Sequence, residues 1–202
     1  GTYSNAYTPN IFTVNNQKGE VLITLEDNSA LKDSLKLYSS EKKEFGSFNT
    51  STGVSINYWM IKPSKMEEGK KYPVLFYVYG GPSSQEVLNS QRRATDMYWG
   101  MMLAQQGYIT ICVDPRGTGM KGEEFRKCTY LQLGKYETED LIEAAKYFGE
   151  LNYIDKNRIG IFGWSYGGYM STLAITKGAD YFKTAIAVAP VTNWRYYDNI
   201  YT

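Results

Sequence analysis

The chain has 202 residues, with 22 lysines and arginines against 21 aspartates and glutamates, and it contains no histidine. A formal charge of +1 creates no global field for a nucleic-acid backbone, so we predict no nucleic-acid partner. The lack of histidine removes the commonest general base and metal ligand from the chain. Two cysteines, Cys112 and Cys128, are too few for a four-ligand zinc site. We therefore assign no metal and no cofactor.

The first 40 residues predict a small β unit followed by a helix. Two strand candidates, at 11–14 and 21–25, are separated by a polar, turn-forming segment. Asn28 and Ser29 can cap a helix whose leucines fall near helical spacing. Because a two-stranded hairpin is marginally stable alone, we expect residues 1–40 to belong to a neighbouring domain.

From residue 41 onward, strands alternate with helices, and no apolar run reaches the roughly 18 residues of a membrane span. We expect strands at 56–61, 73–79, 109–114, 158–163 and 184–189, and helices at 94–106, at 137–151 and from just after Ser165 to about 177. This succession is typical of an α/β fold with a mostly parallel sheet and helices on both faces.

The sharpest chemical signal is Gly163-Trp164-Ser165-Tyr166-Gly167, which has the pattern Gly-x-Ser-x-Gly of a nucleophile elbow. The serine stands between an apolar strand and a helix, where such an elbow must lie. The alternative is a glycine-rich turn with an idle serine. In this fold order the acid and the histidine follow the serine, so we expect both outside this chain and expect the chain alone to be inactive. A naturally inactive hydrolase fold is the competing explanation.

A second signal is the loop from Tyr79 to Gln85, which follows the apolar strand at 73–79. In α/β hydrolases this loop supplies one oxyanion donor, and the N–H after the nucleophile, here that of Tyr166, supplies the other. The Tyr79 hydroxyl is a candidate for the first donor. A strand-terminal aromatic packed on the sheet is the alternative interpretation.

The elbow, the tyrosine loop and the segment from Val188 to Asp198 together resemble the prolyl oligopeptidase superfamily, specifically its dipeptidyl peptidase IV branch. Residues 25–31 are similar to that family's exit from its β-propeller. The resemblance implies that residues 1–40 are the end of a propeller and its linking helix, and that residues 41–202 are the amino-terminal part of an α/β-hydrolase domain. It also implies a serine exopeptidase that releases Xaa-Pro or Xaa-Ala dipeptides from peptides.

The resemblance also implies a role for each site residue. Ser165 would be the acylated nucleophile, and the Tyr79 hydroxyl and the Tyr166 N–H would hold the oxyanion. The pocket for the second substrate residue would be lined by Tyr166, Val191, Trp194, Tyr197 and Tyr201. The glutamates that bind the substrate amine in this family lie outside the chain. The turn 114–119 matches a strand-end turn of the superfamily, for which we expect a structural role.

Other functions stay open at this point. A superfamily relative of different specificity, such as a prolyl oligopeptidase or an acylaminoacyl peptidase, is one rival. A non-catalytic hydrolase-fold binding module is another, although Ser165 is present. A lipase or esterase is a third, although such enzymes commonly use backbone oxyanion donors at this loop. Relatives with a propeller suggest a periplasmic, secreted or cell-surface protein, and a homodimer is an open possibility.

Overall fold

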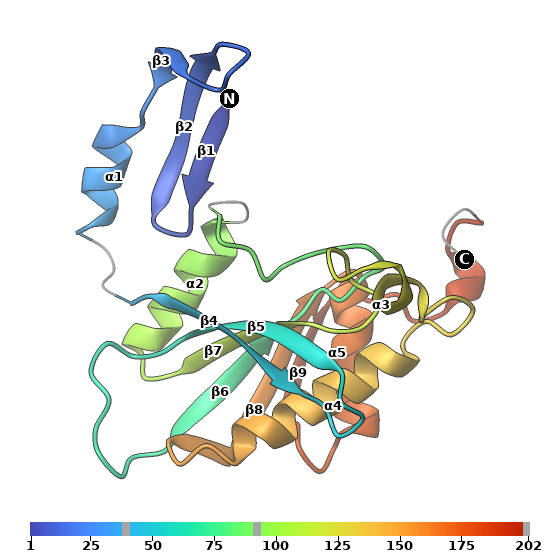
Figure 1. The fold of residues 1–202 in the computed structure, drawn as a ribbon. Coiled ribbons are helices and arrows are strands. Elements are labelled where there is room, and N and C mark those ends of the chain that lie inside the picture. Colours follow the sequence, from blue (N-terminus) through green and yellow to red (C-terminus); the bar gives the residue numbers. More distant parts are fainter. Residues whose placement is uncertain (38–40, 91–93, 200–202) are drawn as a thin grey trace.

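The computed structural model describes residues 1–37, 41–90 and 94–199, which form two separate sheets (Figure 1). The first sheet is antiparallel, with the order β1-β2-β3. Its strands are β1 (Thr2–Asn5), β2 (Thr8–Asn15) and β3 (Val21–Glu26), and α1 (Ser29–Leu35) follows. The predicted hairpin and helix are thus confirmed, and β1 adds a third strand that the sequence pattern did not indicate.

The second sheet has six strands in the order β4-β5-β7-β6-β8-β9. They are β4 (Lys43–Asn49), β5 (Ser55–Ile61), β6 (Tyr72–Tyr77), β7 (Ile109–Asp114), β8 (Ile154–Trp164) and β9 (Thr184–Val188). The pairings among β7, β6, β8 and β9 are parallel, whereas β5 and β4 are added antiparallel at one edge. The sheet is therefore mixed and mostly parallel, as the α/β prediction requires.

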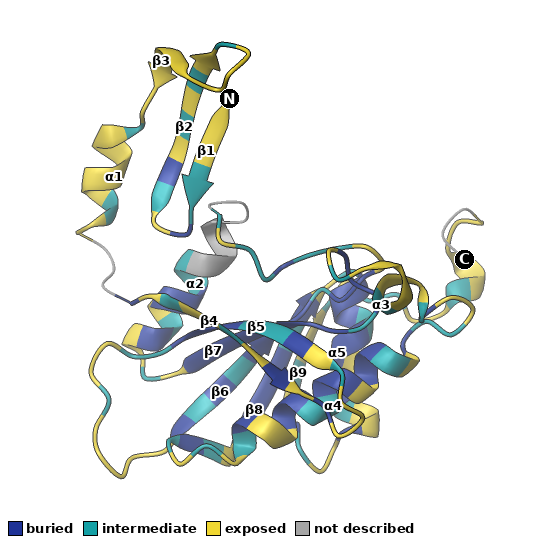
Figure 2. Cartoon of the chain, viewed as in Figure 1, coloured by how far each residue is buried: buried dark blue, intermediate teal, exposed yellow. Residues whose placement is uncertain are grey.

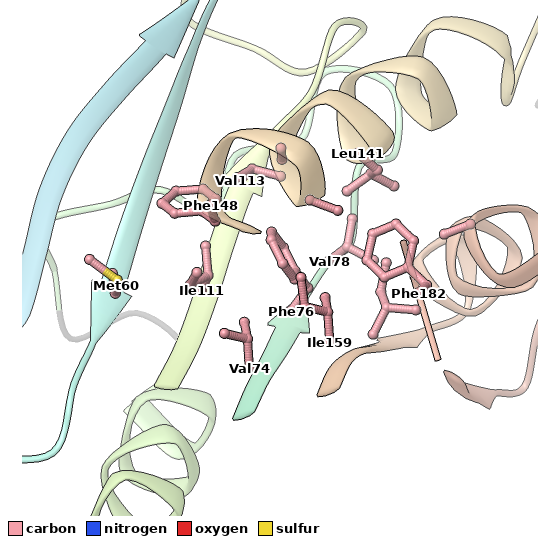
Figure 3. Close-up of a cluster of buried hydrophobic side chains, with 14 of the residues drawn as sticks. Met60, Val74, Phe76, Val78, Ile111, Val113, Leu141, Phe148, Ile159 and Phe182 are labelled. Atoms are coloured by element: carbon pink, nitrogen blue, oxygen red, sulfur yellow. The ribbon is translucent and has the colours of Figure 1, made fainter. Parts of the chain in front are cut away.

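Helices cover both faces of this sheet. They are α2 (Ala94–Gln105), α3 (Glu123–Lys127), α4 (Lys135–Gly149) and α5 (Tyr166–Lys177). Phe76 of β6 packs with Phe148 of α4 in the larger buried cluster, which Figure 3 shows between the sheet and α4. Met101 of α2 packs in a second cluster with Trp59 on the opposite face. All six residues of β7 are buried, because this central strand is covered on both sides.

The structure corrects several predicted boundaries. The strand predicted at 73–79 ends at Tyr77, and the strand predicted at 158–163 begins at Ile154. The helix predicted at 137–151 begins at Lys135, because Gly134 takes a positive φ of 84° and starts the helix. The sequence pattern missed β4 and α3, which are both largely exposed.

The first sheet contacts the second through the turn between β1 and β2. Ala6 in this turn is fully buried in the cluster that contains Trp59, and its N–H donates to Asn89 Oδ1 at 2.9 Å. The Tyr7 hydroxyl donates to the Lys43 carbonyl at 2.9 Å. By contrast, every residue of β3 is exposed (Figure 2). The first sheet thus has little core of its own.

Candidate active site

Ser165, the predicted nucleophile, occupies the single position between β8 and α5. Its backbone has φ 58° and ψ −115°, a conformation that is costly for any residue with a side chain. The Ser165 N–H donates to the Val188 carbonyl at 2.9 Å, and its carbonyl accepts from the Tyr169 N–H at 3.0 Å. The surrounding backbone therefore holds this strained turn from both sides.

Two glycines let the turn approach its neighbours. A Cβ on Gly163 would lie 2.2 Å from the Gly167 carbonyl oxygen, and a Cβ on Gly167 would lie 2.1 Å from the Val78 carbonyl oxygen. Real Cβ atoms do not approach oxygen so closely. The end of β6, the turn and the start of α5 thus meet at backbone contact, which only glycine permits at these positions.

Tyr79 reaches the same edge of the sheet from the neighbouring strand. β6 pairs in parallel with β8, so the carboxyl ends of both strands meet there, and the Val78 N–H continues the pairing to the Phe162 carbonyl at 3.0 Å. Tyr79 is half-buried, and its ring centroid lies 6.2 Å from that of Tyr166. A Cβ on Gly81 would lie 2.6 Å from the Tyr79 ring, so the loop folds closely over this side chain.

The turn 114–119 fixes the loop that follows Tyr79. The buried Asp114 carboxylate accepts the N–H groups of Glu86 and Val87, each at 2.9 Å. Burial raises the pKa of Asp114, and these two hydrogen bonds oppose the rise. The Ser83 N–H also donates to the Gly117 carbonyl at 2.8 Å. These contacts agree with the structural role expected for this turn.

The same turn is tied to α4. The Arg116 guanidinium donates to both carboxylate oxygens of Asp140, and its backbone N–H donates to the same group at 2.7 Å. Asp140 is fully buried, and burial raises its pKa, which the Arg116 contacts oppose. A buried charge needs such a partner, so this pair links α4 to the loops at the site.

A series of aromatic rings extends from the elbow to the segment after β9. Ring centroids are separated by 5.8 Å between Tyr166 and Trp194 and by 5.5 Å between Trp194 and Tyr197. Trp194 begins the short 3-10 helix η1 (Trp194–Tyr196). Tyr166 is buried, Trp194 is half-buried and Tyr197 is exposed, while Val191 is half-buried in the same segment. Tyr201, the last predicted pocket residue, lies outside the described residues.

Two residues that sequence reasoning did not assign also belong to this arrangement. Tyr169 packs edge-on against Tyr166 and Trp194, at 5.5 and 5.4 Å. Its spacing of three residues from Tyr166 on a helix was the signal that both side chains share a face. Glu137 accepts the Tyr166 hydroxyl at 2.6 Å, a contact between distant segments that no sequence pattern indicates.

A cleft of about 660 Å³ opens beside Trp194. One wall comes from the tyrosine loop, and the other comes from the end of α3 and the segment between α3 and α4. The cleft is lined by Pro82, Ser83, Arg126, Lys127, Thr129, Tyr130, Leu131, Gln132, Leu133 and Trp194. Trp194 is thus the ring of the series that borders this open space.

Within residues 1–37, 41–90 and 94–199, no three His, Cys, Asp or Glu side chains gather in a way that could hold a metal ion. In the same described part of the chain, no helix combines the length and the apolar character that crossing a membrane requires.

Comparison with known proteins supplies the family. The family model described as prolyl oligopeptidase family matches residues 95–202, which is more than half of the chain. The chain belongs to the prolyl oligopeptidase family. It is 44% identical to prolyl endopeptidase FAP of Bos taurus over 179 residues, and 38% identical to dipeptidyl aminopeptidase B of Saccharomyces cerevisiae over 195 residues. These matches cover 88% and 93% of this chain.

A solved structure agrees with this assignment. The crystal structure of dipeptidyl peptidase 4 from Porphyromonas gingivalis superimposes with a TM-score of 0.92 over 99% of this chain, at 47% identity. The chain spans only 23% and 24% of the two curated relatives and 28% of the solved chain. The family and the α/β-hydrolase fold are therefore established, and the activity of the whole protein is a separate question.

Proposed function

We propose that this chain carries the nucleophile and the oxyanion site of a serine peptidase that releases amino-terminal Xaa-Pro or Xaa-Ala dipeptides from peptides. The observation that carries the proposal is the strained Ser165 turn beside a continuous series of aromatic rings. Strain of this kind persists where the surrounding structure fixes it, and it is concentrated at functional sites.

The proposed chemistry assigns one role to each group at the Ser165 turn. Ser165 Oγ attacks the carbonyl carbon of the second substrate residue, and its proton passes to a histidine base that lies outside this chain. The negative charge on the carbonyl oxygen is held by the Tyr79 hydroxyl and the Tyr166 N–H. Collapse expels the amine of the third residue, which takes the proton from the base. Water then hydrolyses the acyl-enzyme and releases the dipeptide.

The aromatic series accounts for the proposed substrate class. The rings of Tyr166, Trp194 and Tyr197 pack in series. In this proposal they form, with Val191, an apolar wall next to Ser165, and Tyr201 would extend it. Proline presents a compact, rigid apolar ring that packs on aromatic faces at little cost in rotamer entropy. Alanine fits the same wall with less contact area.

We further propose the domain division at residue 40. Residues 1–40 would be the end of a β-propeller and its linking helix, and 41–202 the first part of the hydrolase domain. The separate three-stranded sheet, with its exposed β3, supports this division. A location in the periplasm, outside the cell or at its surface, and a homodimer, are proposed on the family resemblance alone. Fractionation and light scattering of the full-length protein test these two points.

A second candidate function is cleavage after an internal proline, because one relative is named a prolyl endopeptidase. The two activities differ in their need for a free amino terminus. The test is to compare Gly-Pro-nitroanilide with its N-acetylated form on the full-length protein. We expect release from the free form and much less from the blocked form, whereas equal rates would favour the endopeptidase.

The role of Ser165 is tested in the same assay. A dipeptide phosphonate should form a covalent adduct on the wild-type protein, visible by mass spectrometry, and the Ser165→Ala variant should show neither adduct nor turnover. The 202-residue chain alone should show no turnover, because it holds no histidine to deprotonate the serine. Ser165-dependent turnover by this chain alone would refute the proposal that the base lies outside it.

A further inference from the structure

Tyr166 combines two tasks in the proposed function, on which this inference rests. Its N–H would hold the oxyanion, and its ring would form part of the proline pocket. The side chain is 2% exposed, and its hydroxyl donates to Glu137 Oε1 at 2.6 Å. Glu137 is fully buried as well. A carboxylate from the first turn of α4 thus reaches the residue next to the nucleophile.

Both oxygens of Glu137 are fixed. While Oε1 accepts the Tyr166 hydroxyl, Oε2 accepts the Gly134 N–H at 3.0 Å. Burial raises the pKa of Glu137, and these two hydrogen bonds oppose the rise by favouring the carboxylate. The Arg116–Asp140 pair anchors the same helix one turn later. The carboxylate is therefore a rigid support and not a mobile surface group.

The support acts at the most strained point of the site. Tyr166 directly follows Ser165, whose φ of 58° must be maintained by its surroundings. The ring of Tyr166 also separates Tyr79, at 6.2 Å, from Trp194, at 5.8 Å. A shift of the Tyr166 side chain would therefore disturb the oxyanion N–H and the pocket wall together.

We infer that Glu137 is a positioning residue for the reaction: through the Tyr166 hydroxyl it holds the oxyanion N–H and the pocket ring in register with Ser165. Glu137 does not touch the substrate. Its effect is transmitted by one hydrogen bond, so removing either partner of that bond should have the same consequence.

The test is a double-mutant cycle in the full-length protein with Glu137→Leu, Tyr166→Phe and the combined variant. Leu keeps a branched side chain of similar bulk but has no group that can bond the Tyr166 hydroxyl, whereas Gln could still accept from it or donate to it. Phe keeps the ring and the backbone N–H and removes only the hydroxyl. The control is Glu139→Leu, a half-exposed neighbour on α4 that contacts Arg116 at 3.3 Å and should leave activity unchanged.

The readouts are the melting temperature and, for Gly-Pro- and Gly-Gly-nitroanilide, KM and kcat, with kcat calculated per active site titrated with the phosphonate. We expect each single variant to lower kcat/KM for Gly-Pro by roughly 10- to 100-fold per titrated site, with a smaller loss for Gly-Gly. The kcat/KM of the combined variant should be no lower than that of the less active single variant, because both changes break the same bond.

Two results would overturn the inference. The first is a per-site kcat/KM within about twofold of wild type together with a lowered melting temperature, since a merely structural contact changes stability but not the intact sites. The second is a combined variant whose fold-loss in kcat/KM equals the two single fold-losses multiplied together, since independent changes combine in that way. If Glu137→Leu does not fold, Tyr166→Phe decides by the first criterion. A wild-type protein without Ser165-dependent dipeptide release would overturn the proposed function itself, and the inference with it.

Discussion

The two halves of the candidate site are built in different ways. The elbow half is fixed by backbone: the end of β6, the Ser165 turn and the start of α5 meet where no Cβ fits. The pocket half is formed by side-chain rings and becomes more exposed along the series, from buried Tyr166 at the start of α5 to Tyr197 after β9, which is 42% exposed. The difference teaches that reaction geometry here depends on main-chain packing, whereas specificity depends on rings that can be changed singly.

The largest effect is expected from Gly167→Ala, which changes the backbone contact of the elbow half. The new Cβ would lie 2.1 Å from the Val78 carbonyl oxygen and 3.1 Å from Tyr79 Cα, and these backbone atoms cannot turn aside as a flexible side chain can. α5 must therefore move away from β6 and shift Ser165 and the Tyr166 N–H together. We expect kcat to fall by more than about 1,000-fold and the free energy of unfolding to fall by about 3 kcal/mol.

Gly149→Ala is the matched control for this prediction. Its Cβ would meet the Lys156 side chain at 3.4 Å, an ordinary contact at the end of α4. Activity assays and urea unfolding of both variants give the comparison. Gly167→Ala with near wild-type activity would mean that the elbow tolerates displacement, and the proposed contrast between the two halves would be lost.

The next effect concerns the Tyr79 hydroxyl, whose ring is held by the loop over Gly81. Tyr79→Phe preserves the ring and removes the proposed oxyanion donor, which acts only after the carbonyl becomes tetrahedral. We expect kcat to fall by about 100- to 1,000-fold with little change in KM. Steady-state kinetics with Gly-Pro-nitroanilide test this, with Ser165→Ala as the blank. An unchanged kcat would mean that Tyr79 only packs against its neighbours and does not hold the oxyanion.

How much the sequence predicted follows the same division. The elbow and the strand before it have local signals, because a short apolar strand, glycine spacing and a helix start are written in consecutive residues. Ser165 therefore directly follows β8, as expected, whereas Tyr79 lies just beyond the end of β6 and not inside the strand. The antiparallel edge formed by β4 and β5 was missed in part, because most residues of β4 are exposed and give no apolar alternation. The Glu137–Tyr166 contact joins residues 29 positions apart and has no local signal.

The smallest effect, and the one that sharpens the comparison most, is expected from the exposed end of the pocket half. Tyr197 stacks edge-on against Trp194 at 5.5 Å and is 42% exposed, so its removal takes away part of the pocket wall without disturbing the core. For Tyr197→Ala we expect a loss of about 1–2 kcal/mol in transition-state binding, or roughly 5- to 30-fold in kcat/KM, with Gly-Pro-nitroanilide. Gly-Gly-nitroanilide presents no ring to this wall, so its kcat/KM should change by less than about twofold and the preference for proline should shrink. Tyr196→Ala is the matched control, because that neighbouring ring is 87% exposed and should be neutral on both substrates. Equal losses on the two substrates would mean that Tyr197 supports the catalytic half, and the two halves would then not be separable.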